Sequence, residues 1–360
     1  MPLNHAIRQC ASIAPAFLTA AAVALLGAAA QNPSDKNQLQ RRQFEQVEMG
    51  MPFKVLLYSA DPQAANRAAA AAFARIHELN GVMSDYDSGS ELSRLSATAG
   101  SGKATPVSAD LWNVLSRAQK LADQSDGAFD VTVGPLIKLW RRARRAKEMP
   151  SPERLAEAKV SVGHDSLRLD PEARTAELLK PGMRLDLGGI AVGFALDEAL
   201  KVLAEHGITQ VLIDGSGDIV VGDPPPGEPG WRIGVAPSEG KNSVASRYLS
   251  LKNCALTTSG DDVQFVEFDG KRYSHILDPR TGLGVTDHSS VTIVAPDCIT
   301  ADSLATATSV LGPKRGMALL EHYPGTTALI LRRNGSQVET TQSPGFEKYL
   351  IKSKNTPPPK

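Results

Sequence analysis

The sequence predicts an α+β protein in which mainly antiparallel strands pack against helices. Helical patterns are mixed with hairpin signals along the chain, rather than alternating regularly with single strands. The clearest hairpin signal is Asp269–Gly270, which stands between two strand-like segments. No segment repeats at the spacing of a solenoid, and 360 residues suffice for one large or two modest domains with a substantial core.

The charge balance argues against one class of partner. The chain carries 39 basic and 39 acidic side chains, so no net field favours nucleic acid or an anionic membrane surface. We therefore expect no nucleic-acid partner.

The first thirty residues are expected to be a secretory signal peptide. A basic residue precedes an apolar run over 11–30 that ends in three alanines. An uncleaved membrane anchor is the alternative, because the run approaches the length of a spanning helix. We expect export to the periplasm, because no cysteine stands where a lipoprotein would be acylated. Cleavage near Ala30 would remove Cys10 and leave Cys254 and Cys298, between which a disulfide is permitted but not demanded.

The first half of the domain, expected over residues 47–345, follows a polar lead over 31–46. A strand is expected over 47–59, with Met49–Gly50 at its entrance. Helices are expected over 61–80, ended by Gly81, over 109–124, capped by Ser108, and over 135–148. The arginines of the last helix favour a solvated basic face, with the docking of an acidic partner as the alternative.

In the second half, a helix is expected over 190–206 because apolar residues recur at helical spacing, and Gly207 ends it. Helices follow from about residue 301 and over 314–322, and a tail over 346–360 is expected to be partly disordered. Strands are expected at 209–223, in two parts, and at 231–236, 247–259, 263–268, 272–277, 291–295 and 327–341, the last as a hairpin.

Asp302 and Thr306 form the clearest pair of candidate metal ligands. They lie four residues apart on an expected helix, so they project from one face. A carboxylate and a hydroxyl are hard oxygen ligands, which suit Mg²⁺ when phosphates and water supply the rest. The alternative is that Asp302 only interacts favourably with the helix dipole.

Two other segments carry candidate chemistry near turn residues. His275 is a candidate general base, because imidazole titrates near neutral pH, and a hydrogen-bonded structural histidine is the alternative. Asp278 and Arg280, which follow it, are expected to pair and hold their loop. Phe129 beside Asp130 suggests a site for a planar heterocycle, with a buried phenylalanine and a capping carboxylate as the alternative.

The segment at 186–197 places Asp186 and the Gly188–Gly189 turn directly before a helix. An anionic group, or its metal ion, can sit at such a helix start, where backbone groups are exposed. A tight turn into a core-facing helix is the alternative.

Together these motifs resemble the ApbE-type FAD:protein FMN transferases in their order along the chain. The resemblance spans residues 47–335 and implies a T-fold-related core. It also implies that FAD is cleaved at its diphosphate with Mg²⁺, that FMN passes to a threonine of an acceptor flavoprotein, and that AMP is released. The motifs are Met49–Gly50 and the segments 83–96, 127–140, 186–197, 213–219, 257–261, 273–282 and 294–307.

The resemblance also implies roles for individual residues. The FAD contacts would be Met49, Tyr86, Ala128, Phe129, Asp130, Asp186, the residue at 192 and His275. The backbone carbonyl of Gly189 would join Asp302 and Thr306 on the metal. His275 or Asp302 would take the proton of the threonine hydroxyl. The protein would contact a membrane only through its signal segment or through a membrane-bound acceptor.

Two departures from the family pattern stand out. Val192 replaces a usual lysine. Either Lys180 or Arg184 compensates for the lost contact, or the affinity for FAD is lower. A basic run also follows Trp140 instead of a Gly-aromatic segment. We hypothesise that charge reversal at Arg141 and Arg142 weakens acceptor modification and spares FAD binding. The rival functions are an Mg²⁺-dependent FAD pyrophosphatase, which yields FMN and AMP, and a flavin-binding protein without turnover.

Overall fold

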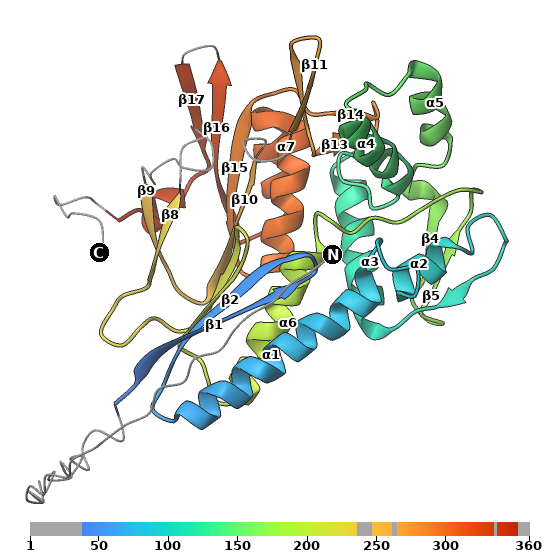
Figure 1. Ribbon diagram of the computed structural model, residues 1–360. Helices are drawn as coiled ribbons and strands as arrows, with labels where there is room; N and C mark the ends of the chain where they lie inside the picture. Colours follow the sequence, from blue (N-terminus) through green and yellow to red (C-terminus); the bar gives the residue numbers. More distant parts are fainter. Residues whose placement is uncertain (1–37, 236–246, 261–264, 335–336, 352–360) are drawn as a thin grey trace, which may run out of the picture. The chain divides into compact units, whose positions relative to one another are not determined.

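The computed structural model describes residues 38–235, 247–260, 265–334 and 337–351, all within one compact unit (Figure 1). The expected signal peptide over 1–30 and the last residues of the tail, 352–360, lie outside the described residues. Within the described ranges, no helix combines the length and apolar character needed to cross a membrane.

An eight-stranded sheet forms the centre of this unit (Figure 1). Every neighbouring pair of strands in it is antiparallel, which confirms the predicted α+β class. In spatial order the strands are β1 (Gln40–Glu48), β2 (Met51–Ser59), β6 (Val211–Gly215), β7 (Asp218–Val221), β10 (Cys254–Gly260), β15 (Ser289–Ala295), β16 (Thr327–Asn334) and β17 (Gln337–Gln342).

The two faces of the sheet are covered differently because side chains alternate along each strand. Val55 and Leu57 of β2 belong to the larger apolar core, which also holds residues of the helices α1 (Pro62–Met83), α6 (Ala191–Glu205) and α7 (Cys298–Leu320). Leu56 and Tyr58 pack into a second core, which also holds residues of β8 (Trp231–Val235) and β9 (Arg247–Leu251).

The remaining elements lie outside the large sheet. Four helices and a three-stranded sheet fill most of the segment from 84 to 180, and two short hairpins lie between β10 and β15. The elements are α2 (Glu91–Ser96), β3 (Thr105–Pro106), α3 (Ala109–Gln124), α4 (Gly134–Ala146), α5 (Pro152–Val160), η2 (His164–Ser166), β4 (Leu167–Asp170), β5 (Thr175–Leu178), β11 (Phe265–Phe268), β12 (Lys271–Ser274), β13 (Leu277–Asp278), β14 (Leu283–Gly284) and η3 (Phe346–Tyr349).

The N-terminal strands differ from the expectation. β1 begins at Gln40, inside the segment expected to be a polar lead, and it pairs with β2 along its whole length. Met49 and Gly50 are the turn between the two strands, with φ of 49° and 78°. A two-residue hairpin turn that needs positive φ at both positions explains this pair better than a strand entrance.

The C-terminal end of α1 is determined by the burial of its last residue rather than by a glycine. α1 passes through Gly81 and ends at Met83, so the predicted stop at Gly81 was wrong. Met83 is buried in the core, and its burial outweighs the roughly 1 kcal/mol that a helical glycine costs. The predicted division of the last helical region is present as a kink in α7 at Gly312, which has φ of 72° and precedes Pro313.

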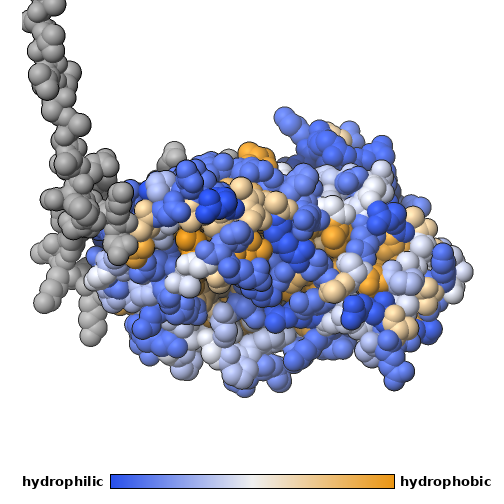
Figure 2. Space-filling view, turned by 90° about the horizontal axis from the view of Figure 1, so that it is seen from below, coloured by the Kyte–Doolittle hydropathy of each residue, from blue (hydrophilic) through white to orange (hydrophobic). Residues whose placement is uncertain are grey.

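Two further expectations are corrected. The single strand expected over 247–259 is divided into β9 and β10 at Asn253, whose φ is 47°. Phe346, in the expected tail, is fully buried in the second core. Cys254 and Cys298 are both buried and free, so they form no disulfide. The face seen in Figure 2 is mostly hydrophilic, with small hydrophobic areas.

Candidate active site

A cavity of about 220 Å³ brings most of the expected site residues together. It lies among the loop that precedes α4, the start of α6, the segment before β13, and α7. Its apolar lining includes Ile137, Trp140 and Leu277. The expected residues that line it are Tyr86, Ala128, Phe129, Asp130, Asp186, Gly189, His275 and Thr306.

The loop that carries Phe129 and Asp130 is fixed by its own polar groups. The Ser125 hydroxyl accepts a hydrogen bond from the Phe129 N–H at 3.1 Å. The Asp130 carboxylate accepts one from the Thr132 N–H at 2.7 Å. Both Phe129 and Asp130 are buried, and burial raises the pKa of Asp130. The loop therefore presents a planar apolar ring beside a fixed carboxylate.

Asp186 connects this loop to the start of α6. Its N–H donates to the Val131 carbonyl at 2.8 Å, and its carboxylate accepts from the Gly188 N–H at 2.9 Å. Burial and the neighbouring Asp85 raise the pKa of Asp186, while Arg141 opposes the rise. The carboxylate is therefore held rigidly at the edge of the cavity.

Arg141 of α4 lies in the cavity rather than on a free helix face. Its guanidinium donates to Asp186 at 2.9 Å and also bonds Asp85. The guanidinium carbon lies 4.2 Å from the centre of the Tyr86 ring. Of the two arginines in the charge-reversal hypothesis, Arg141 therefore lines the cavity, whereas Arg142 is exposed.

Gly189 and Thr306 meet where α6 begins beside α7. A Cβ at Gly189 would lie 2.8 Å from the Thr306 hydroxyl oxygen, so only glycine allows the backbone to approach this closely. Asp302, one turn earlier on α7, is buried and accepts a hydrogen bond from the Gly193 N–H at 3.1 Å. The start of α6 is thus joined directly to the pair expected to bind metal.

Further carboxylates stand near Asp302. Burial, Asp218 and Asp197 raise the pKa of Asp302 well above its usual range. Burial also raises the pKa of Asp218 to about 6. Negative charge in this region is therefore costly, and a cation would offset it.

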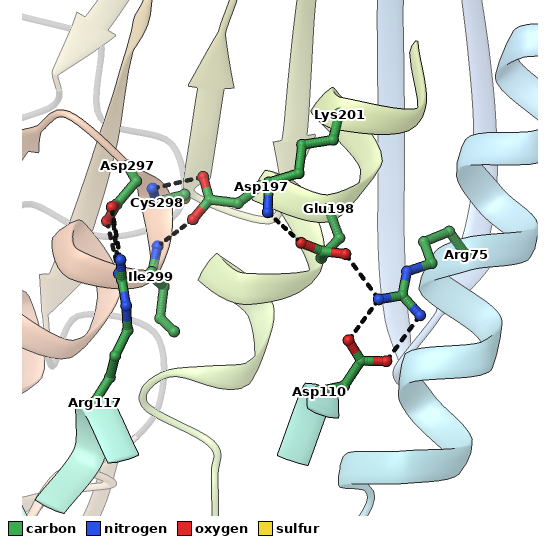
Figure 3. Close-up of polar contacts among 9 residues, drawn as sticks. All are labelled: Arg75, Asp110, Arg117, Asp197, Glu198, Lys201, Asp297, Cys298 and Ile299. Carbon is green, nitrogen blue, oxygen red and sulfur yellow. Dashed lines mark hydrogen bonds and ion pairs between the residues drawn. The ribbon is translucent and has the colours of Figure 1, made fainter. Parts of the chain in front are cut away.

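Asp197 fixes α7 against α6 (Figure 3). Its carboxylate accepts hydrogen bonds from the Cys298 and Ile299 N–H groups, at 2.8 and 2.9 Å. These are backbone groups in the first turn of α7, which the helix itself leaves without partners. The register between the two helices, and with it the position of Asp302 relative to Gly193, depends on this cap.

The adjacent Glu198 ties α6 to two more helices (Figure 3). Arg75 of α1 donates to Glu198 at 2.7 Å, and it bonds both carboxylate oxygens of Asp110 at the start of α3. α6 is therefore anchored on both sides, and the cavity edge that it supplies is held in place.

His275 lines the cavity in a half-buried position. The backbone on either side of it is held, because Ser274 donates to the Val285 carbonyl and the Val285 N–H donates to Ile276, each at 2.8 Å. The Asp278 side chain accepts from the Arg280 side chain at 2.8 Å through both of its oxygens. The predicted pairing in this loop is confirmed.

Three expected residues are not among those that line the cavity: Met49, Val192 and Asp302. Val192 is buried in the larger core, and Met49 packs against that core from the β1–β2 turn. Neither Lys180 nor Arg184, expected to compensate for Val192, lines the cavity. The cations that do line it are Arg141 and Arg144 of α4.

Sequence reasoning missed the role of Arg141 in the cavity and the partner carboxylates Asp85, Asp197 and Asp218. Each of the three carboxylates lies within a motif already singled out, but nothing in local spacing indicates which residue it faces. In the described residues, no cluster of three or more His, Cys, Asp or Glu side chains is arranged to hold a metal. The expected metal ligands include only one side chain of these types, Asp302. The other two donors are the Thr306 hydroxyl and the Gly189 carbonyl.

The fold and the cavity together indicate the kind of ligand that this protein can bind. An antiparallel sheet with helices on one face, and a cavity that offers aromatic, acidic and cationic groups at a helix start, is suited to a planar ligand that carries anionic groups.

The chain belongs to the ApbE family, whose model matches residues 49–330. It is 34% identical over 280 residues to the FAD:protein FMN transferase of Haemophilus influenzae, covering 76% of this chain and 80% of that protein. It is 34% identical over 307 residues to the protein of the same name from Treponema pallidum, covering 81% and 84%. The flavin transferase ApbE from Vibrio cholerae has a similar structure, with a TM-score of 0.77 and 28% identity over 87% of this chain and all of that one.

Proposed function

We propose that the chain transfers FMN from FAD to the hydroxyl of a threonine on an acceptor protein and releases AMP. The transferase class follows from its family and from the activity named for its relatives. The observation that carries the site assignment is that Phe129, Asp186 and Thr306, from three distant segments, line one cavity.

In the proposed reaction, the threonine oxygen forms a bond to the FMN phosphorus of FAD. The bond from that phosphorus to the bridging oxygen breaks, and AMP leaves with this oxygen. The proton of the threonine hydroxyl must go to a base. His275 is suited to accept it, because it is the one histidine among the described residues that lines the cavity. Asp302 is less suited, because it is buried and does not line the cavity.

We further propose that Mg²⁺ is held by Asp302, Thr306 and the carbonyl of Gly189. The donor set fits, because a carboxylate, a hydroxyl and a carbonyl are the oxygen ligands that Mg²⁺ prefers. The close approach of the Gly189 backbone to the Thr306 side chain supports this assignment, as does the group of carboxylates around Asp302. When bound, the ion would neutralise charge on the diphosphate.

Export to the periplasm with cleavage near Ala30 remains a proposal from the apolar N-terminal run. Sequencing the N-terminus of the protein recovered from the periplasm would test it. An unprocessed protein in the membrane fraction would instead identify an anchor.

The activity is tested by incubating residues 31–360 with FAD, Mg²⁺ and an acceptor domain that carries the target threonine. We expect the acceptor to gain the mass of one FMN moiety and in-gel flavin fluorescence. Asp302→Ala should abolish both, and an acceptor with its threonine replaced by alanine should gain nothing.

Two results would contradict the proposal. AMP and free FMN without acceptor modification would identify an FAD pyrophosphatase. Bound FAD that stays intact for hours, with no AMP released, would identify a flavin-binding protein.

A further inference from the structure

Tyr86 is an unusual surface residue, because its large ring is 79% exposed at the mouth of the cavity. Its backbone is fixed, since the Tyr86 N–H donates to the Ser84 hydroxyl at 3.2 Å. Its ring is covered by the Arg141 guanidinium, 4.2 Å from the ring centre. An exposed aromatic ring that is held in place is suited to stack against a planar ring of a ligand.

Arg141 is itself held by two carboxylates. Asp85 and Asp186 both accept hydrogen bonds from it, and only 26% of its side chain is exposed. A planar guanidinium fits this role because it can bond carboxylates along its edge while an aromatic ring covers its face. Arg141 therefore connects the rigid Asp186 turn to the otherwise exposed Tyr86.

We propose that Arg141 is a positioning residue for FAD, which clamps the Tyr86 ring as a platform on which one planar ring system of the dinucleotide stacks. The proposal rests on the proposed function, because it takes FAD as the ligand.

A double-mutant cycle on FAD affinity tests the clamp. The dissociation constant is measured by flavin fluorescence in EDTA for wild type, Arg141→Ala, Tyr86→Ala and the double variant. We expect each single change to weaken binding on the order of tenfold. The Arg141→Ala effect should largely disappear when Tyr86 is already alanine, because Arg141 acts through that ring.

Arg142→Ala is the matched control, because Arg142 is the next residue on α4 and is exposed. We expect it to bind FAD as wild type does. With Mg²⁺ and acceptor present, Arg141→Ala should raise the KM for FAD and leave kcat near the wild-type value, a split that a general loss of structure would not produce. Tyr86→Phe keeps the ring and should keep the affinity.

Arg141→Lys covers the case in which the alanine variant fails to fold. It keeps the charge beside Asp85 and Asp186 but lacks the planar group, so we expect wild-type thermal stability with FAD binding weakened about threefold or more. Wild-type affinity in Arg141→Lys would overturn the clamp. Equal effects of Arg141→Ala with and without Tyr86 would also overturn it. If the wild type bound no FAD, the proposed function would fall together with this inference.

Discussion

A side chain larger than hydrogen at position 189 would collide with Thr306. The ideal Cβ would lie 2.8 Å from the Thr306 hydroxyl oxygen and 3.1 Å from its methyl carbon. Either the Thr306 side chain or the backbone at position 189 would have to move, and both belong to the proposed metal site. The local cost is therefore a cost to function as well as to packing.

We expect Gly189→Ala to destabilise the protein by about 1–3 kcal/mol, as overpacking does. It should also lower the Mg²⁺-dependent rate of acceptor modification at least tenfold and raise the Mg²⁺ concentration that gives half the maximal rate. Gly81→Ala is the control, because no atom lies within 4 Å of its Cβ position in α1. That change should stabilise the protein by up to about 1 kcal/mol. A Gly189→Ala enzyme with normal Mg²⁺ dependence would contradict the site.

The raised pKa of Asp197 makes the free energy of unfolding depend on pH. Burial raises its pKa to about 6 from the ordinary 3.8, so its contribution to stability is fully present below about pH 4. That contribution is lost as pH rises through about 6, because the buried carboxylate must then ionise. Asp197→Asn removes the ionisation.

We expect the free energy of unfolding of Asp197→Asn, relative to wild type, to rise by about 1–3 kcal/mol between pH 4 and pH 8. Urea unfolding in EDTA at a series of pH values measures it. A difference between variant and wild type that stays constant over this range would show that Asp197 is ionised at the same pH in both states.

At the scale of elements, α4 presents two kinds of arginine. Arg141 lies inside the cavity, whereas the exposed cations of the helix form no ion pair with any other described residue. These exposed cations are Lys138, Arg142 and Arg145 of α4 and Lys147 directly after it, whereas Arg144 is exposed but also lines the cavity. In the proposed reaction the acceptor threonine reaches the cavity beside α4, so an acidic acceptor surface would meet this face of the helix.

We expect Arg142→Glu with Arg145→Glu to weaken acceptor modification about tenfold and to make it less sensitive to salt. FAD affinity should change less than twofold. Arg41→Glu with Arg67→Glu makes the same charge change on β1 and α1 and is the control. If both pairs slow the reaction equally, the effect belongs to net charge rather than to α4.

The elements that the sequence predicts are those whose burial is periodic and whose ends carry caps. α3 begins where Ser108 accepts a hydrogen bond from the Leu111 N–H, as expected, and the hairpin at Asp269 and Gly270 is present. α5 was missed because none of its residues is buried, so it has no apolar period to detect. β1 was missed because most of its residues are exposed.

The site could be predicted in part for a similar reason. Asp186, Phe129 and Thr306 stand in motifs whose order along the chain identifies the family. Arg141 could not be placed, because its partners Asp85 and Asp186 become its neighbours only through tertiary packing. Val192 was expected at the ligand but is buried in the core, because its position in the first turn of α6 faces the sheet.

At the scale of the whole unit, the two cores on opposite faces of the sheet stabilise different elements. The larger core packs the helices that carry the site, and the second core packs the β8–β9 hairpin and Phe346. Stability and ligand binding can therefore be separated by substitution.

We expect Phe346→Ala to lower the free energy of unfolding by about 3–5 kcal/mol, because the ring is fully buried. FAD affinity should be unchanged at temperatures where the variant stays folded. Chemical unfolding and fluorescence titration on the same sample measure both. A loss of affinity in the folded variant would mean that the two faces of the sheet are coupled.

The residues that line the cavity range along the chain from Tyr86 to Thr306. No early part of the chain can therefore form the site before α7 has been added, and folding must close contacts over long sequence separations. Bound FAD would in turn contact segments from widely separated parts of the chain. FAD would thus bind only after the whole unit has folded. Its binding would slow global unfolding more than local fraying.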